Sequence, residues 1–354
     1  MKTGKVSENI LKRSVLRQLK TERKEVLSGA GVGRDCAIFS FSDGIVISCM
    51  QEAAVTVGNA AGCVSGHDNV RFTMAQLIQK CANNLAASGA EPTAVMVALF
   101  LPEALEESEL KALMAEAEEK CRELSVAIAG GQTRITKAVV SPMAVITGYG
   151  RMLSEGHSAG HTLKAAAPGQ DVVVTKWIGL EGTAFLAECC GEQLRSRYPA
   201  YLVEEAAGFH RYLSILPEAA VAIKSGVCAM HDASEGGVFA ALWELAECAG
   251  VGLTIDLKKL PLRQETVEVC EYCNVNPYQL LSGGCLVMTT EDGPGLAERL
   301  HARQIPAAVV GKVTNESSRL LLNEDEVRYM DRPARDELYR FLEENVLKEK
   351  GLLS

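Results

Sequence analysis

The sequence lacks three features that would place the protein at a membrane or on nucleic acid. None of its 354 residues lies in an uninterrupted apolar run approaching the ~18 residues that a membrane-spanning helix requires. A basic balance is also missing, because the formal net charge is −9 at pH 7 and a nucleic-acid binder normally needs a basic face. The first residues lead into a charged segment and lack the apolar core of a signal peptide. We therefore expect a cytoplasmic protein that binds neither nucleic acid nor membrane.

Several familiar signatures are absent as well. The sequence contains no Walker A loop, no Rossmann fingerprint and no fixed-period repeat. Aromatic residues make up only 5% of the chain, so the core should be mostly aliphatic. The 12 cysteines mostly stand singly among apolar neighbours, and the one C-x-x-C, from Cys270 to Cys273, has no second pair at zinc-finger distance. Reduced thiols and no structural metal are expected.

The length is sufficient for two domains at ~150 residues each. Residues 150–170 contain four glycines and Pro168 with few apolar anchors, which is typical of a boundary. We predict an N-terminal domain over residues 1–155, a second domain over residues 156–330, and a C-terminal helix and tail over residues 331–354.

The first half alternates strands with helices, which predicts an α/β or α+β domain. Residue patterns indicate helices over 7–19 (with Ser7 as N-cap), 69–88 and 106–124, a loop over 51–68, and strands over 36–41, 45–49, 95–101, 126–129 and 138–149.

The second half also combines the apolar spacing of strands with that of helices. Patterns there indicate strands over 171–175, 227–230, 251–256, 285–290, 307–312 and 318–322, and helices after Thr183, over 200–225 with a break near Pro217, over 238–249 and over 332–348.

Two adjacent carboxamides, Asn83 and Asn84, stand at the end of the predicted 69–88 helix. The apolar residues of that helix recur at helical spacing and leave both asparagines off the apolar stripe. Asparagine is a poor residue for a helix interior, because its side chain competes for backbone hydrogen bonds. The pair therefore indicates either a local helix cap or a polar site that faces a cleft.

Four predicted loops share one pattern, a strand that runs into a glycine-rich turn carrying a polar side chain. Glycines let backbone N–H groups approach an anion, and a following helix N-terminus adds a favourable dipole. Each turn alone is also ordinary loop chemistry. Together they favour a phosphate-bearing ligand between the domains. The four turns are 31–35, 130–133, 179–183 and 231–237.

Four other polar residues are candidates for the site, and three of them have an alternative role. His231 is suited to proton transfer near neutral pH. Asp232 either binds Mg²⁺ or caps the following helix, and Ser234 is an equally good cap. Lys5 and Lys176 are candidate phosphate contacts or ordinary surface lysines.

Taken in order, these motifs resemble the aminoimidazole ribonucleotide (AIR) synthetase-related superfamily, and the Gly-Leu-Glu-Gly-Thr stretch resembles its HypE-type hydrogenase-maturation branch. The matching segments are Gly4-Lys5, Gly33-Arg34-Asp35-Cys36-Ala37-Ile38, Ala82-Asn83-Asn84-Leu85, Gly130-Gly131-Gln132-Thr133, Lys176-Trp177-Ile178-Gly179-Leu180-Glu181-Gly182-Thr183 and His231-Asp232-Ala233-Ser234-Glu235-Gly236-Gly237.

The resemblance implies an N-terminal α/β domain, whose sheet forms a barrel with that of a second subunit in a homodimer, and a C-terminal α+β domain. It also implies ATP and Mg²⁺ as cofactors and ATP-dependent phosphoryl transfer to a small-molecule or carbamoyl-type substrate. The residues implied for nucleotide binding are Asp35, Asn83, Asn84, Gly130, Gly131, Thr133, Lys176, Gly179, Glu181, Gly182, Thr183, Gly236 and Gly237. Those implied for the metal are Asp35, Glu52, Asn84 and Asp232, and Lys5 and His231 are implied near the reacting group.

The chain departs from the family pattern at the acidic positions. Asn84 stands where the family usually has aspartate, and Glu52 is a displaced substitute for a second aspartate that is missing. An amide oxygen binds Mg²⁺ without contributing charge, so weakened metal binding is expected. HypE proteins carry their reacting group on a terminal cysteine, whereas the last cysteine here is Cys285. The alternative function is therefore that of a non-catalytic family member that binds or regulates.

Overall fold

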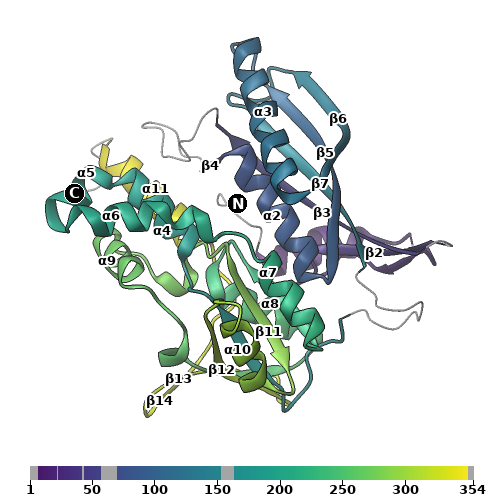
Figure 1. Ribbon diagram of the computed structural model, residues 1–354, viewed down its shortest axis with the longest axis vertical. Coiled ribbons are helices and arrows are strands. Elements are labelled where there is room, and N and C mark those ends of the chain that lie inside the picture. Colours follow the sequence, from purple (N-terminus) through teal and green to yellow (C-terminus); the bar gives the residue numbers. More distant parts are fainter. Residues whose placement is uncertain (1–6, 22, 42–43, 57–69, 153–162, 350–354) are drawn as a thin grey trace.

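The structure, a computed structural model, describes residues 7–21, 23–41, 44–56, 70–152 and 163–349. Figure 1 shows two sheet-containing halves, one above the other, each with helices packed on its sheet. The predicted site residue Lys5 lies outside the described residues, as do residues 57–68 of the predicted loop and part of the predicted boundary. No helix in these ranges is long and apolar enough to cross a membrane.

The N-terminal half is a mixed seven-stranded sheet with helices on one face. Its path is β1-β2-β3-β7-β5-β6, and β4 pairs with β3. Helices α2 (Met74–Ala87) and α3 (Glu107–Leu124) cover the buried face, where Leu77, Leu113 and Val97 belong to one core (Figure 1). The strands are β1 (Val26–Ser28), β2 (Cys36–Phe41), β3 (Gly44–Val55), β4 (Arg71–Phe72), β5 (Ala90–Leu101), β6 (Ala127–Ile135) and β7 (Met143–Met152).

Helix α2 begins at a capping box. The Thr73 hydroxyl accepts from the Gln76 N–H, and the Gln76 side chain accepts from the Thr73 N–H. The predicted start at residue 69 is therefore wrong, because Arg71 and Phe72 pair with β3 instead. Gly89, at φ +82°, follows the last turn as predicted.

The C-terminal half is a second seven-stranded sheet between two helix layers. Side chains of β8 alternate across it, so that Val172 and Val174 pack toward α8 (Gly237–Ala249). Val173 packs instead with α7 (Leu216–Lys224) and α10 (Gly293–His301). The strand order is β14 (Glu326–Tyr329), β13 (Arg319–Asn323), β10 (Gly252–Asp256), β12 (Ala307–Thr314), β8 (Asp171–Thr175), β11 (Cys285–Thr290) and β9 (Ala229–Ala233).

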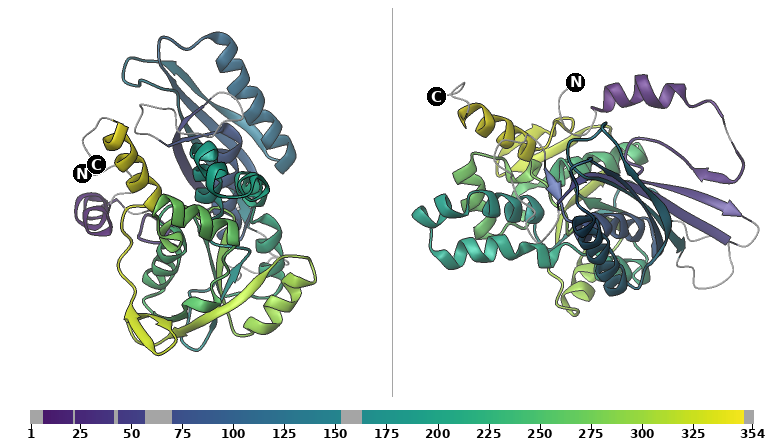
Figure 2. Two further views of the ribbon diagram at one scale, coloured as in Figure 1. Left: turned by 90° about the vertical axis from the view of Figure 1, so that its left-hand side faces the viewer. Right: turned by 90° about the horizontal axis from the view of Figure 1, so that it is seen from above.

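A helical cluster extends from one side of this sheet (Figure 2). Its core includes Phe185, Val203, Val269 and Leu338. The helices are α4 (Leu180–Cys189), α5 (Gly191–Arg197), α6 (Ala200–Ala207), α9 (Gln264–Cys273) and α11 (Glu337–Glu349). The first described helix, α1 (Glu8–Ile10), continues through π and 3-10 turns to Gln18, and Ser7 stands at its N-cap without a side-chain hydrogen bond.

Several predicted boundaries are wrong for the same physical reason, since pairing with a distant strand overrides weak local propensity. Strand β3 continues through Val55 because it pairs with β7, so the predicted loop cannot start at residue 51. The predicted turn 130–133 lies inside β6, and the strand predicted from residue 138 starts at Met143. His231 and Asp232 lie in β9, which pairs with β11. Helices α5, α9 and α10 and strands β1, β4 and β14 were not predicted. Helix α7 begins at Leu216 with Pro217 in its first turn, and α11 starts later than predicted, at Glu337.

Candidate functional site

A cavity of about 680 Å³ lies between the two halves. That volume is within the range of ~300–1,000 Å³ typical of small-molecule sites. Its wall is strongly acidic, with six carboxylates facing one lysine. The carboxylates are Asp35, Glu52, Asp232, Glu235, Glu244 and Asp336, and the lysine is Lys80.

Asp35 is held at the cavity by the close approach of its loop to α8. Gly33 has φ +68°, and a Cβ there would lie 2.3 Å from the backbone oxygen of Glu244. Only glycine permits this contact, which brings the following turn against the helix. Asp35 therefore reaches the side of the cavity formed by the C-terminal half.

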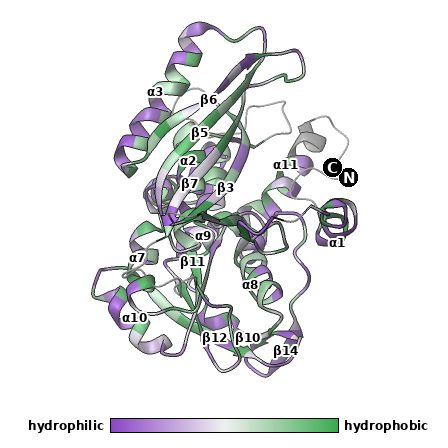
Figure 3. Ribbon diagram, turned by 90° about the vertical axis from the view of Figure 1, so that its right-hand side faces the viewer, coloured by the Kyte–Doolittle hydropathy of each residue, from purple (hydrophilic) through white to green (hydrophobic). Residues whose placement is uncertain are grey.

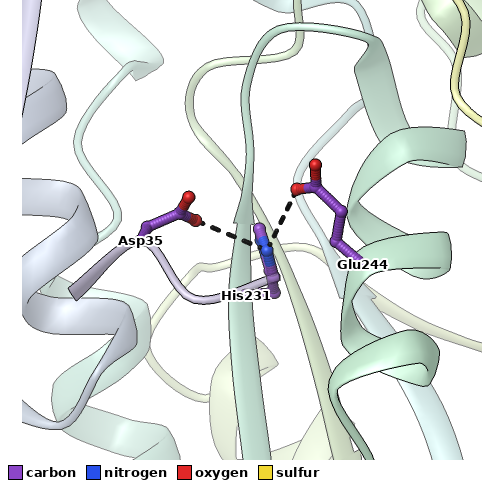
Figure 4. Close-up of side chains that lie close together, drawn as sticks. All are labelled: Asp35, His231 and Glu244. Carbon is purple, nitrogen blue, oxygen red and sulfur yellow. Dashed lines mark ion pairs between the residues drawn. The ribbon is translucent and has the colours of Figure 1, made fainter. Parts of the chain in front are cut away.

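His231 lies between two carboxylates (Figure 4). Its Nε2 is 3.4 Å from Asp35 Oδ2 and 3.4 Å from Glu244 Oε2. Its Nδ1 lies 2.9 Å from the backbone oxygen of Asp232. Burial alone would lower the pKa of this imidazole, but the two carboxylates outweigh burial and raise the pKa to about 10.

Asn84 pairs with Asp232 across the cavity floor. In the amide orientation that satisfies its neighbours, its nitrogen donates to Asp232 Oδ1 (3.1 Å) and Oδ2 (2.9 Å), and its oxygen accepts from Gln51 Nε2 (2.7 Å). Burial, together with the nearby charge of Asp35, raises the pKa of Asp232 to about 6. The pair is thus satisfied by hydrogen bonds within the protein.

Asn83 points elsewhere. Its nitrogen donates to the Leu213 carbonyl (2.8 Å), and its oxygen accepts from the Ile215 N–H (3.2 Å) and from Gln79 Nε2 (2.9 Å). These contacts tie α2 to the segment before α7. The paired asparagines therefore separate into one that joins the two halves and one that faces the cavity.

The other predicted lysine is a buried structural group. Lys176 Nζ lies 2.6 Å from Glu218 Oε1 and donates to the carbonyls of Tyr212 and Ser214. The expectation that it is a surface lysine is therefore wrong. Its nucleotide contact stays a prediction, and it does not line the cavity.

The glycines predicted to contact phosphate do not line the cavity, and several of them make tight packing contacts instead. Gly131 permits the close approach of β6 to β5, because a Cβ there would lie 1.8 Å from the Val97 oxygen. Gly182 packs against Leu280 in the same way, and the Gly236 N–H donates to Asp336 Oδ2 (2.6 Å). The remaining members of this group are Gly130 and Thr133 in β6, Gly179 at the N-cap of α4, Thr183 beside Thr266, and Gly237 at the start of α8.

Four charged cavity residues were not assigned to the site from the sequence, namely Lys80, Glu235, Glu244 and Asp336. Lys80 stands one helical turn before Asn84, a spacing that places both on one helix face. Its Nζ is 2.6 Å from Oε2 of the buried Glu181 and 4.9 Å from the centre of the Phe72 ring. Glu244 was visible as one of only two carboxylates, with Glu247, in the otherwise apolar helix α8. Asp336 carried no local signal.

Comparisons with known proteins agree with this architecture. Residues 33–152 match the AIR synthase related protein, N-terminal domain, and residues 167–322 match the AIR synthase related protein, C-terminal domain. A Methanocaldococcus jannaschii protein described as a hydrogenase expression/formation protein is 26% identical over 325 residues, which are 90% of this chain and 91% of that protein. The carbamoyl dehydratase HypE of Rhodobacter capsulatus is 28% identical over 241 residues, 66% of this chain and 67% of that protein.

A solved structure shares the fold. The hydrogenase maturation protein HypE in complex with ATP superposes with a TM-score of 0.61 at 17% identity, over 95% of this chain and 97% of that chain. The two domain matches, which together span most of the chain, agree with the two halves seen in the structure. The chain therefore belongs to the AIR synthase-related superfamily, as a HypE-like member with its two-domain α/β and α+β fold.

Proposed function

We propose that the cavity binds ATP with Mg²⁺ and that the chain uses them for phosphoryl transfer to a small-molecule or carbamoyl-type substrate. The observation that carries the proposal is the position of Lys80, the one lysine or arginine among the described residues that line the cavity of about 680 Å³, beside six carboxylates. Such a wall repels a bare phosphate chain. A nucleotide that arrives with a divalent cation satisfies both the carboxylates and the lysine. The ATP complex of a HypE protein with the same fold supports this choice.

The acidic residues fit a magnesium ion in part. Asp35, Glu52 and Asp232 offer the carboxylate oxygens that Mg²⁺ prefers. Partial burial and the charge of Glu235 raise the pKa of Glu52, which shows that negative charge is crowded there. Asn84 is a poorer ligand in this arrangement, because its oxygen already accepts from Gln51. Mg²⁺ at these carboxylates would neutralise phosphate charge.

Lys80 is the proposed phosphate contact. The buried Glu181 and the Phe72 ring fix its ammonium group, and its side chain is 13% exposed at the cavity. A lysine held in this way supplies positive charge with little loss of side-chain entropy on binding. The predicted roles of His231 near the reacting group and of the glycine-rich segments in backbone contacts stay predictions.

Calorimetric titration with ATP, with and without Mg²⁺, tests the proposal. Wild-type protein should bind ATP more tightly with Mg²⁺, and Lys80→Met should weaken binding by about tenfold, or ~1.4 kcal/mol. Lys258→Met is the control, because Lys258 is an exposed lysine that pairs with Glu324 and does not line the cavity. An absence of heat at millimolar ATP would overturn the proposal.

A second candidate function is a non-catalytic binding or regulatory protein. The Asn84–Asp232 pair favours it, because an amide–carboxylate pair is stable without the cation that two facing carboxylates would require. Nucleotide binding that is indifferent to Mg²⁺, with no ATP turnover, would select this function over the first.

We also propose that the chain forms a homodimer through the N-terminal sheet. The face of this sheet opposite α2 and α3 exposes Met50, Met96, Phe100 and Met143, and Phe100 is the cross-strand partner of Met143. Figure 3 shows the apolar character of these strands beside the more polar α3. An apolar face of this kind marks an interaction surface. Sedimentation should show a wild-type dimer that Phe100→Asp dissociates, whereas Val327→Asp on β14 should not.

A further inference from the structure

One wall of the cavity gathers three side chains with metal-ligand chemistry. Asp35 comes from the loop before β2, His231 from β9 and Glu244 from α8 (Figure 4). One ligand atom from each lies within 4.8 Å of the other two. The three thus converge from separate parts of the chain on one small volume.

The tautomer of His231 follows from its backbone contact. A carbonyl oxygen can only accept, so Nδ1 must donate its hydrogen to the Asp232 carbonyl at 2.9 Å. In the neutral ring, Nε2 then carries a lone pair. That lone pair faces two carboxylates, which also offer only lone pairs. Either a proton or a metal ion must occupy the space between them.

The burial of Nε2 is a second observation that points to an ion at this position. His231 is 8% exposed, and Nε2 makes no hydrogen bond with any described residue. Buried polar atoms nearly always have a partner, so an exception at a cavity wall calls for an ion or ligand.

The distances favour a metal over a simple hydrogen bond. At 3.4 Å, both Nε2–oxygen contacts are longer than the ~2.7–3.2 Å of a good hydrogen bond. Two ligands that hold a zinc ion at ~2.0–2.1 Å with tetrahedral angles stand about 3.3–3.4 Å apart. We infer that Asp35, His231 and Glu244 bind a zinc-type divalent cation, with the fourth coordination position open to the cavity.

Ligand chemistry distinguishes this site from the magnesium site proposed above, with which it shares Asp35. An imidazole nitrogen suits zinc or cobalt, whereas magnesium prefers oxygen ligands alone. The backbone bond from Nδ1–H is the support that metal-bound histidines usually have, because it fixes ring orientation. Three protein ligands and an open position are typical of zinc sites that act on a substrate or a bound water. The inference does not depend on nucleotide binding.

The three ligand side chains are held close together before a metal ion binds. The close contact of Gly33 with the Glu244 backbone holds the Asp35 loop against α8, and β9 lies beside β11. The Asp35 side chain is 35% exposed, so its rotation can bring the third ligand atom closer to the other two.

Cobalt titration of the metal-free full-length chain, without nucleotide, tests the inference. Co²⁺ in a tetrahedral nitrogen and oxygen site gives intense visible absorption, whereas an octahedral oxygen site gives weak absorption. We expect one equivalent of strongly absorbing Co²⁺ that Zn²⁺ displaces and excess Mg²⁺ does not. Thiolate-to-cobalt charge transfer would instead assign the metal to cysteines and overturn the inference.

Matched variants locate the ion. Glu244→Gln and His231→Gln should each weaken Zn²⁺ binding by at least about tenfold. Glu235→Gln removes a carboxylate that lines the same cavity outside the triad, and it should leave Zn²⁺ affinity within about twofold. Equal affinity in Glu244→Gln and wild type, with both folded by circular dichroism, would overturn the assignment. If a variant does not fold, the wild-type Co²⁺ spectrum still decides the outcome.

Discussion

Asn84 and Asp232, from the two halves of the chain, face each other as a hydrogen-bonded amide and carboxylate, with Nδ2 at 3.1 and 2.9 Å from the two carboxylate oxygens. The family resemblance implies an aspartate at the first of these positions. Two facing carboxylates in a buried site repel each other unless a cation lies between them. With asparagine, the repulsion becomes a hydrogen bond, so the cavity floor is stable without metal.

Replacing Asn84 with aspartate should restore the need for a cation. Asn84→Asp removes the amide donors and adds a second carboxylate beside Asp232, whose pKa is already raised to about 6 by burial and by Asp35. We expect a loss on the order of 3 kcal/mol in the free energy of unfolding with chelator present. Added Mg²⁺ should recover much of this loss and tighten ATP binding. Urea unfolding with and without Mg²⁺ measures the effect.

Asn84→Ala is the control for this prediction. It removes the same hydrogen bonds without adding charge, so it should be destabilised with no recovery in Mg²⁺. If Asn84→Asp responded to Mg²⁺ no more than Asn84→Ala, position 84 would not be near the ion.

Replacing the neighbouring asparagine, Asn83, should lower the stability of the fold and leave ligand binding unchanged. Asn83→Ala leaves the Leu213 carbonyl and the Ile215 N–H without their buried partner, at a cost of about 1–3 kcal/mol for each. Asn83 does not line the cavity. Thermal unfolding should therefore show a large loss of stability, while calorimetry below the transition should show unchanged ligand affinity. If Asn83→Ala bound the ligand more weakly but kept full stability, Asn83 would not serve to join the two halves.

The helices show what local pattern predicts well. Apolar spacing identified α2 and α8, because one face of each packs on a sheet. The capping box at Thr73, a threonine followed three residues later by Gln76, was not recognised, and the start of α2 was therefore predicted too early. Residues 51–55 were unpredictable, because their small and polar side chains form a strand only through pairing with β7.

The candidate site likewise contains residues that the sequence predicted and contacts that it did not predict. Asp35, Asn84, His231 and Asp232 were identified from motifs and Glu52 as a substitute for a missing aspartate, and all five line one cavity. The burial of Lys176 was not predictable, because it depends on Glu218, which is distant in sequence. The partnership of His231 with Glu244 depends on how α8 packs against β9, and no spacing in the sequence encodes that contact.

Metal-free protein should lose stability as pH rises through the titration of His231. Burial lowers the pKa of His231, but Asp35 and Glu244 raise it overall from 6.5 to about 10. The folded state therefore holds a proton that the unfolded state releases. This contribution is complete below pH ~6.5 and is lost as pH rises toward ~10. Urea unfolding in chelator across this window should show the decline.

His231→Gln should remove this part of the decline, because glutamine does not titrate. His301→Gln is the matched control, since His301 lies at the surface and contacts the Ala307 backbone. Parallel declines in wild type and His231→Gln would show that another group is responsible.

Gly33→Ala should detach Asp35 from the other two triad residues. The new methyl group would lie 2.3 Å from the Glu244 backbone oxygen, and φ +68° costs a non-glycine residue about 1–2 kcal/mol. Since α8 is fixed by its own core, the loop must move and carry Asp35 away. We expect Co²⁺ affinity to fall at least about tenfold, with stability lower by about 1–3 kcal/mol. Gly29→Ala, in the same loop, is the control, because a methyl group there meets only Val26 at an ordinary 3.5 Å. Unchanged Co²⁺ affinity in folded Gly33→Ala would show that Asp35 is not a ligand.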